Sequence, residues 1–149
     1  MTATTARSFF TAEEKETIRL AIMNAELDTS GEIRVHIENT CVGESLERAA
    51  YLFKQLKMHK TKLRNGVLIY LAIKNRKFAI IGDAGINKVV PDNFWDEIRH
   101  RMLNRFHEDQ FVEGLSEAVT LTGEQLKQHF PYSVEDVNEL PDDISFGEN

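Results

Sequence analysis

The stretch Val67-Leu-Ile-Tyr-Leu-Ala-Ile73 sets the architecture of this chain, because its apolar residues follow one another without alternation. Such a run is typical of a β-strand that is covered on both faces. Residues 74–77 have the composition of a tight turn, and residues 78–81 form a second apolar run. The two runs predict an antiparallel hairpin centred between Asn75 and Arg76.

An earlier strand is predicted at residues 32–38, which alternate strictly between polar and apolar positions. Ile33, Val35 and Ile37 share one side, so we expect a strand with a single buried face. A helix over residues 45–57 connects this strand to the apolar run. A strand–helix–strand connection of this kind predicts that the two strands are parallel.

Further helices complete a three-layer fold. Thr11 and Glu14 form a capping box at the start of the first helix, and later helices are expected from Asp92 onward and over residues 110–129. This order predicts an α/β/α sandwich around a small mixed sheet, in which one hairpin strand is antiparallel. We expect a single domain over residues 1–132, followed by an acidic and mostly irregular tail over 133–149.

The charge of the chain is segregated. Residues 48–82 hold nine basic and no acidic side chains, whereas residues 134–149 hold six acidic and no basic ones, which equals the net charge of −6. A body that is neutral overall is not suited to general nucleic-acid binding. We expect Leu140, Ile144 or Phe146 to anchor the tail on the body, near the basic end of the helix over 45–57.

Several functional classes are excluded by composition and motifs. The single cysteine, Cys41, rules out an internal disulfide framework and a cysteine-based zinc site. The start of the chain does not resemble a signal sequence, and no apolar run is long enough to span a membrane. The familiar nucleotide-binding, hydrolase and metalloprotease motifs are absent. We expect a cytoplasmic monomer.

The topology predicts a cation site at one edge of the sheet. Parallel strands would bring Glu32 and Asn65 to the same edge, and the antiparallel strand would return Asp83 there, opposite Leu68. Carboxylate, amide and carbonyl oxygens are ligands that Ca²⁺ accepts. Asp92 is a further candidate ligand, although its position before a helix also suits an N-cap.

Two acids at one sheet edge repel each other unless a positive group joins them. A divalent cation or Arg64 could supply that charge. Lys57, Lys60, Lys62 and Arg64 follow the helix over 45–57 in a basic cluster. They form either a solvated face or a docking surface for an anionic partner or for the tail.

Five segments together resemble the TPM domain: Thr-Ser-Gly-Glu-Ile-Arg-Val-His-Ile (29–37), Ala-Ala-Tyr-Leu-Phe (49–53), Asn-Gly-Val-Leu-Ile-Tyr (65–70), Lys-Phe-Ala-Ile-Ile-Gly-Asp-Ala-Gly-Ile (77–86) and Val-Val-Pro-Asp (89–92). Residues 111–115 also resemble a late segment of that domain. The resemblance extends over about residues 10–130, which is nearly the whole folded body.

The resemblance implies a Rossmann-like α/β/α sandwich. TPM proteins include thylakoid-lumen proteins linked to photosystem II repair, modulators of acetylcholine receptors and many bacterial proteins. Some are credited with acid phosphatase activity, and calcium binding has been associated with the domain. By resemblance, Glu32 and the region of Asp83 and Asp92 would lie at the cation site. The chain departs from the family in having Asp83 where an aromatic residue is common, and in lacking a signal peptide or membrane anchor.

These observations favour a non-catalytic module that binds a divalent cation, with Ca²⁺ as the expected ion and an unidentified protein as the expected partner. The alternative is a metal-dependent acid phosphatase, in which Asp83 or Asp92 would attack or activate water and Lys62 or Arg64 would hold the phosphate. A third possibility is a protein-interaction domain without an ion.

Overall fold

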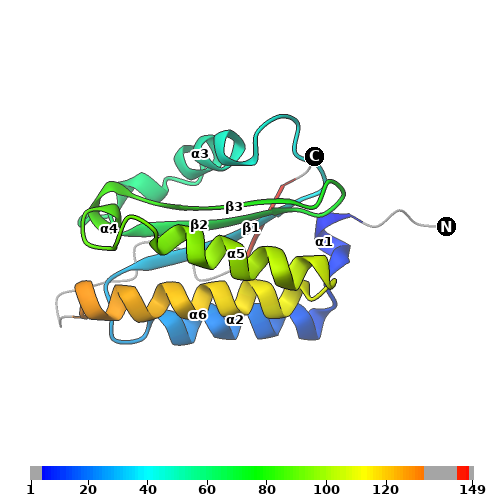
Figure 1. The fold of residues 1–149 in the computed structure, drawn as a ribbon. Helices are drawn as coiled ribbons and strands as arrows, with labels where there is room; N and C mark the ends of the chain where they lie inside the picture. The colour runs from blue at the N-terminus through cyan, green and yellow to red at the C-terminus, as the bar shows by residue number, and fades with distance from the viewer. Residues whose placement is uncertain (1–4, 133–143, 148–149) are drawn as a thin grey trace.

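The computed structural model describes residues 5–132 and 144–147. A mixed four-stranded sheet lies between two helical layers, as Figure 1 shows, so the predicted α/β/α sandwich is confirmed. The strand order is β3-β2-β1-β4. The strands are β1 (Glu32–Glu38), β2 (Gly66–Ala72), β3 (Lys77–Gly82) and β4 (Ser145–Phe146). The helices are α1 (Ala6–Phe9), α2 (Ala12–Glu26), α3 (Ser45–Gln55), α4 (Ala84–Asn87), α5 (Phe94–His107) and α6 (Phe111–His129), and a 3₁₀ turn, η1, spans Met58–Lys60.

The central strands pair as their sequences predict. β1 and β2 are parallel, from Glu32 opposite Gly66 to Glu38 opposite Ala72. β3 returns antiparallel to β2. Every residue of β2 is buried, which confirms that an unalternating apolar run marks a strand covered on both faces.

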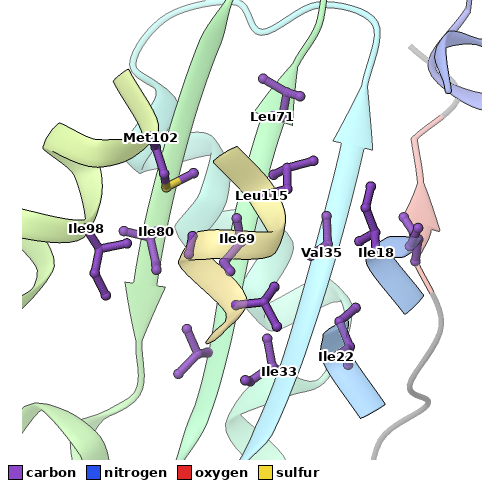
Figure 2. Packing of buried hydrophobic residues seen from close by; sticks show 14 of the residues in the cluster. Ile18, Ile22, Ile33, Val35, Ile69, Leu71, Ile80, Ile98, Met102 and Leu115 are labelled. Atoms are coloured by element: carbon purple, nitrogen blue, oxygen red, sulfur yellow. The ribbon is translucent and has the colours of Figure 1, made fainter. Parts of the chain in front are cut away.

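The larger core lies between the sheet and the layer of α2, α5 and α6. In Figure 2, side chains of β1 and β2 point toward these helices, with Ile33 and Val35 lying near Ile22 and Ile18. A smaller core on the opposite face packs α3 and Met58 against the even-numbered side chains of β2. The two cores make the sheet an inner layer, and its central strands β1 and β2 are buried on both faces.

β1 differs from its prediction, because it is buried on both faces. The polar side of the strand lies under the α3 layer, where Arg34 is 8% exposed, His36 4% and Glu38 0%. The prediction of a single buried face was therefore wrong. Alternation in this strand separates an apolar core from a buried polar layer rather than from solvent.

The hairpin is also shifted from its predicted register. Val67 lies opposite Gly82 and Ala72 opposite Lys77, so the turn occupies residues 73–76 and places Arg76 at a φ of 55°. Asp83 consequently follows the pair of Val67 and Gly82 and lies opposite Gly66, not Leu68. Asp83 therefore lies in the same row of the sheet as Glu32 and Gly66.

The helix starts agree with the sequence in part. Thr11 Oγ1 accepts from the Glu14 amide at 3.1 Å, and Glu14 Oε1 accepts from the Thr11 amide at 2.9 Å, so the predicted capping box is present. α5 begins at Phe94 after Asn93, so Asp92 does not cap it. Among the described residues, no helix is both long and apolar enough to cross a membrane.

Residues 144–147 lie along the outer edge of β1. Ser145 and Phe146 pair with β1 as the parallel strand β4, and Ile144 is buried in the larger core. Two of the three expected anchors, Ile144 and Phe146, thus contact the body, whereas Leu140 falls outside the described residues. Their place is beside β1 and not at the basic end of α3.

Candidate functional site

Glu32, Gly66 and Asp83 lie in one row across the sheet, at the edge where β1 and β2 begin and β3 ends. Glu32 pairs with Gly66, and the Asp83 amide donates to the Gly66 carbonyl oxygen at 2.9 Å. Paired residues of neighbouring strands project from the same face, so the two acids flank a glycine. Their Cα atoms are two strand spacings apart, about 10 Å. Glu32 is 3% exposed and Asp83 7%, so both acids are buried.

A backbone oxygen lies above the glycine of this row. A Cβ added to Gly66 would meet the Met58 carbonyl oxygen at 2.9 Å, a distance that leaves no room for any other residue. Met58 is fully buried in η1, directly after α3. The row therefore offers a carbonyl oxygen as well as two carboxylates.

Arg64 is the counter-ion of Asp83. Its Nε donates to Asp83 Oδ2 at 2.6 Å and its Nη2 donates to Oδ1 at 2.8 Å. The hydrogen bond to Asp83 raises the pKa of Arg64 above its ordinary value. The arginine side chain is 52% exposed, whereas that of Asp83 is 7% exposed. Arg64 thus reaches a buried acid from the solvent side, which is one of the two ways expected to relieve the repulsion at this edge.

Asn65 brings an amide to the same edge with one group unsatisfied. Its side chain is 1% exposed, and its Nδ2 donates to Ser30 Oγ at 3.3 Å. The Oδ1 atom is buried and has no hydrogen-bond partner among the described residues. An amide oxygen left in this state costs about 1–3 kcal/mol. A cation or a water molecule at this position would remove that cost.

The loop after Asp83 is held against the loop before β2 by a close backbone contact. The Gly85 amide donates to the Arg64 carbonyl oxygen at 2.8 Å. A Cβ on Gly85 would lie 2.0 Å from the Leu63 carbonyl oxygen. Only glycine permits this approach, which keeps Asp83 beside Arg64.

The donor set suits a hard cation only if amide and carbonyl oxygens take part. Among residues 5–132 and 144–147, no group of three or more His, Cys, Asp and Glu side chains is placed to hold a metal ion. Glu32 and Asp83 would supply two carboxylates, and Asn65 and Met58 would supply neutral oxygens. Ca²⁺ binds such mixtures, because it takes six to eight oxygen ligands in flexible geometry.

Asp92 does not join this group. It is exposed in the turn before α5. Its neighbours Pro91 and Asn93 line a hollow together with the end of α6, on a different part of the surface. Of the four predicted ligands, the structure brings Glu32, Asn65 and Asp83 to one edge.

The predicted basic surface borders this edge. Lys57, Lys60, Lys62 and Arg64 are all exposed. Beside them lies a groove of about 440 Å³ between α3 and the end of β3, lined by Lys54, His59, Arg64 and Asp83 and by apolar residues of α3. The Nδ1 atom of His59 is buried without a described hydrogen-bond partner. The groove thus combines an apolar wall with a basic rim.

A buried ionic cluster at the opposite edge of the sheet was not predicted. Glu38, at the end of β1, is 0% exposed. Arg48 donates to both of its carboxylate oxygens, from Nε at 3.1 Å and from Nη2, and Tyr70 Oη donates to Oε2 at 2.6 Å. Burial, assisted by this hydrogen bond, raises the pKa of Tyr70, so the hydroxyl keeps its proton. The cluster fixes α3 to the sheet.

His36 links this cluster to β4. Its Nε2 lies 3.5 Å from Glu38 Oε1, and its Nδ1 is 2.7 Å from Ser145 Oγ. Burial lowers the pKa of His36, although the neighbouring Glu38 opposes the shift. The imidazole is therefore neutral near pH 7, and it contacts both the Glu38 cluster and the C-terminal segment.

Comparison with known proteins identifies the family. The family model of the TPM domain matches residues 4–125. The chain belongs to the TPM domain family. The match includes β1, β2 and β3 and ends within α6, so β4 lies outside it.

Three solved structures share this TPM fold. The BA42 protein of the psychrophilic bacterium Bizionia argentinensis, determined by NMR, is 47% identical with a TM-score of 0.86, over 93% of this chain and 96% of that chain. The N-terminal domain of a P. gingivalis protein is 21% identical with a TM-score of 0.70, over 83% and 82%. The N-terminal domain of the cg2496 protein of Corynebacterium glutamicum is 10% identical with a TM-score of 0.62, over 95% and 83%. The last two similarities concern the fold alone. None of the curated proteins matches the chain.

Proposed function

We propose that this TPM domain binds a divalent cation, best fitted by Ca²⁺, at the edge formed by Glu32, Asn65 and Asp83, and that it acts as a non-catalytic binding module. The observation that carries the proposal is the buried Asn65 Oδ1 without a partner, beside a row with two buried carboxylates. An ion at this position would satisfy the amide oxygen and take the two carboxylates as ligands.

Arg64 and the cation would compete for Asp83. In the structure the guanidinium holds both carboxylate oxygens, so a cation that takes Asp83 as a ligand must displace it. Because the Arg64 side chain is 52% exposed, it can turn into solvent once a cation takes over the negative charge of Asp83. Binding would then free one positive charge beside Lys57, Lys60 and Lys62.

This exchange suggests how an ion would affect a partner. A released Arg64 strengthens the basic surface, which favours docking of an anionic protein segment. The domain would then serve as a cation-responsive accessory to another protein. The proposal includes that the protein is a cytoplasmic monomer. Analytical ultracentrifugation tests whether it is monomeric.

Thermal unfolding across a series of cations tests the binding. A ligand present at 100 times its Kd stabilises the folded state by about 2.7 kcal/mol, which raises the Tm of a domain of this size by about 5–10 °C. We expect Ca²⁺ to produce such a rise in the wild type and not in Asp83→Asn. Asp92→Asn is the matched control, since it removes an exposed acid outside the row.

The variant Arg64→Gln tests whether Arg64 and the cation compete for the Asp83 carboxylate. Without Arg64 the apo protein should melt at a lower temperature, and Ca²⁺ should bind more tightly because its competitor is gone. If the variant binds Ca²⁺ no better than the wild type, competition at Asp83 is wrong. If no cation raises the Tm of any of these proteins, the domain acts without an ion.

A metal-dependent acid phosphatase is the second candidate, favoured by the groove that places Lys54, His59 and Arg64 beside Asp83. Basic side chains would hold a phosphate ester there, while Asp83 and the cation would assist attack on phosphorus. Turnover of a generic phosphomonoester that requires a divalent cation and is lost in Asp83→Asn would support it. Absence of turnover at all cation concentrations removes it.

A further inference from the structure

The outer edge of β1 is closed by the C-terminal segment of the chain itself. Ser145 lies opposite His36 and Phe146 opposite Ile37, and the Gly147 amide donates to the Ile37 carbonyl oxygen at 2.9 Å. β4 is only two residues long, whereas β1 has seven. In Figure 1 this short strand, drawn in red, lies at the margin of the sheet. The main-chain pairing alone is therefore weak.

Three side chains give the segment its specificity. Ile144 is 7% exposed within the larger core, on the side of the sheet where Figure 2 shows Ile18 and Val35. Ser145 contacts His36. The Phe146 ring lies 5.5 Å from the Arg7 guanidinium carbon and 5.1 Å from Lys15 Nζ. The edge thus recognises an aliphatic, a hydroxyl and an aromatic residue in succession.

The charges around this edge are complementary to the segment. Arg7 of α1 and Lys15 of α2 flank the aromatic position. In the sequence, Asp142 and Asp143 precede the buried isoleucine, and an acid follows at position 148. Basic side chains beside the aromatic position and acidic residues around the motif favour an acidic ligand at this end of the edge. Glu26, in contrast, occupies the other end by accepting from the Ile33 amide at 2.7 Å.

The β1 edge lies within the range of the family match, whereas the segment that covers it lies beyond the end of that match. The family match ends at residue 125 and includes β1 but not the segment over 144–147. Without that segment, the main-chain N–H and C=O groups of β1 that face residues 145–147 would lack a strand partner. The position that Ile144 occupies would also be open to another extended chain. Addition of a strand to such an edge is a common mode of peptide recognition.

We propose that the β1 edge is a docking groove for an extended acidic segment of a partner protein, and that residues 144–147 occupy it in cis as a competing ligand. The partner segment carries an aliphatic residue, a small hydroxyl residue and an aromatic residue in succession, with acidic residues around them. It pairs parallel to β1 and places its aromatic ring between Arg7 and Lys15. The C-terminal segment thereby sets the concentration that a partner segment must reach before it can dock.

This threshold concentration follows from tethering. Residues 133–143 join the segment to the body, and a tethered ligand on a short connection acts at an effective concentration on the order of millimolar. A free peptide with the same contacts must exceed that concentration to displace it. Release of the segment should therefore increase the apparent affinity for a free peptide tenfold or more.

The first test uses the full-length chain and the labelled decapeptide Leu-Pro-Asp-Asp-Ile-Ser-Phe-Gly-Glu-Asn, which is its own residues 140–149. Fluorescence anisotropy compares the wild type with the double variant Ile144→Ser/Phe146→Ser. We expect the double variant to bind the peptide at least tenfold more tightly. Val42→Ser is the control, because Val42 is 94% exposed outside the groove, and it should bind like the wild type.

Three outcomes overturn the proposal. Equal affinity of the double variant and the wild type would mean that the segment does not compete for the groove. A scrambled decapeptide that binds as tightly would mean that the order of side chains is not recognised. A wild-type dimer that dissociates in the double variant would assign the groove to a second copy of the chain and overturn the partner assignment.

A second measurement needs no destabilising variant. NMR follows the Gly147 amide of the wild type while the unlabelled decapeptide is added up to millimolar concentration. Displacement breaks its hydrogen bond to Ile37, so the signal should shift progressively. No shift with the decapeptide, or the same shift with the scrambled peptide, would contradict displacement in cis.

Discussion

Arg48→Met should destabilise the fold strongly, because it leaves the Glu38 carboxylate buried without its counter-ion. Arg48 donates to both carboxylate oxygens, and Tyr70 Oη also donates to the carboxylate, at 2.6 Å. Removal of one partner of a buried ion pair costs about 3–5 kcal/mol. The Arg48 side chain is 30% exposed, so water can partly replace it, and we expect about 3 kcal/mol.

Thermal and urea unfolding measure this loss. At about 2–4 °C per kcal/mol for a chain of this size, the Tm should fall by about 6–12 °C. The urea midpoint should fall without a change in the m-value, because the same surface is exposed on unfolding. Glu38→Gln in the Arg48→Met background should recover part of the loss, since it removes the uncompensated charge.

Arg19→Met is the matched control for this prediction. Arg19 pairs with Glu16 on the exposed face of α2, and a surface pair of this kind contributes little. The control should therefore leave the Tm nearly unchanged. If Arg48→Met costs no more than Arg19→Met, the buried ion pair does not hold α3 on the sheet.

Three further predictions test other parts of the structure. Because burial lowers the pKa of His36 below 6.5, the unfolded chain binds more protons, so stability should fall as the pH drops below about 6.5; His36→Gln should flatten that slope in urea titrations, and an unchanged slope would contradict the assignment. Gly85→Ala should lower the free energy of unfolding by about 1–3 kcal/mol, because the added Cβ clashes with the Leu63 carbonyl oxygen. An unchanged Tm would refute the close contact. Thr11→Ala should cost about 1 kcal/mol in urea unfolding, because the capping box with Glu14 is lost, and no loss would mean that the cap is dispensable.

The positions of the two central strands were predictable from the pattern of apolar residues, although the burial of both faces of β1 was not. The apolar run from Val67 and the alternation from Glu32 to Glu38 gave both central strands and their parallel pairing. The hairpin register was missed because the turn begins at Ile73, an apolar residue that the sequence pattern assigns to the strand. β4 was missed as a strand, since two residues carry no periodic signal.

The topology that gathers three of the candidate ligands was predicted, whereas the contacts that surround them were not. Strand ends brought Glu32, Asn65 and Asp83 together, because parallel and antiparallel directions follow from the order of elements. Asp92 lies elsewhere, since the residues after Asp83 form α4 and carry the chain away. The Glu38 cluster escaped prediction because its partners are ten and 32 residues distant in sequence.

Isothermal titration of Ca²⁺ into the wild type and into Glu32→Gln/Asp83→Asn measures directly whether the row of carboxylates holds an ion. We expect a saturable heat in the wild type that disappears in the double variant, while Asp92→Asn retains it. Equal heats in the wild type and the double variant would place any bound ion elsewhere and refute a cation site in this row.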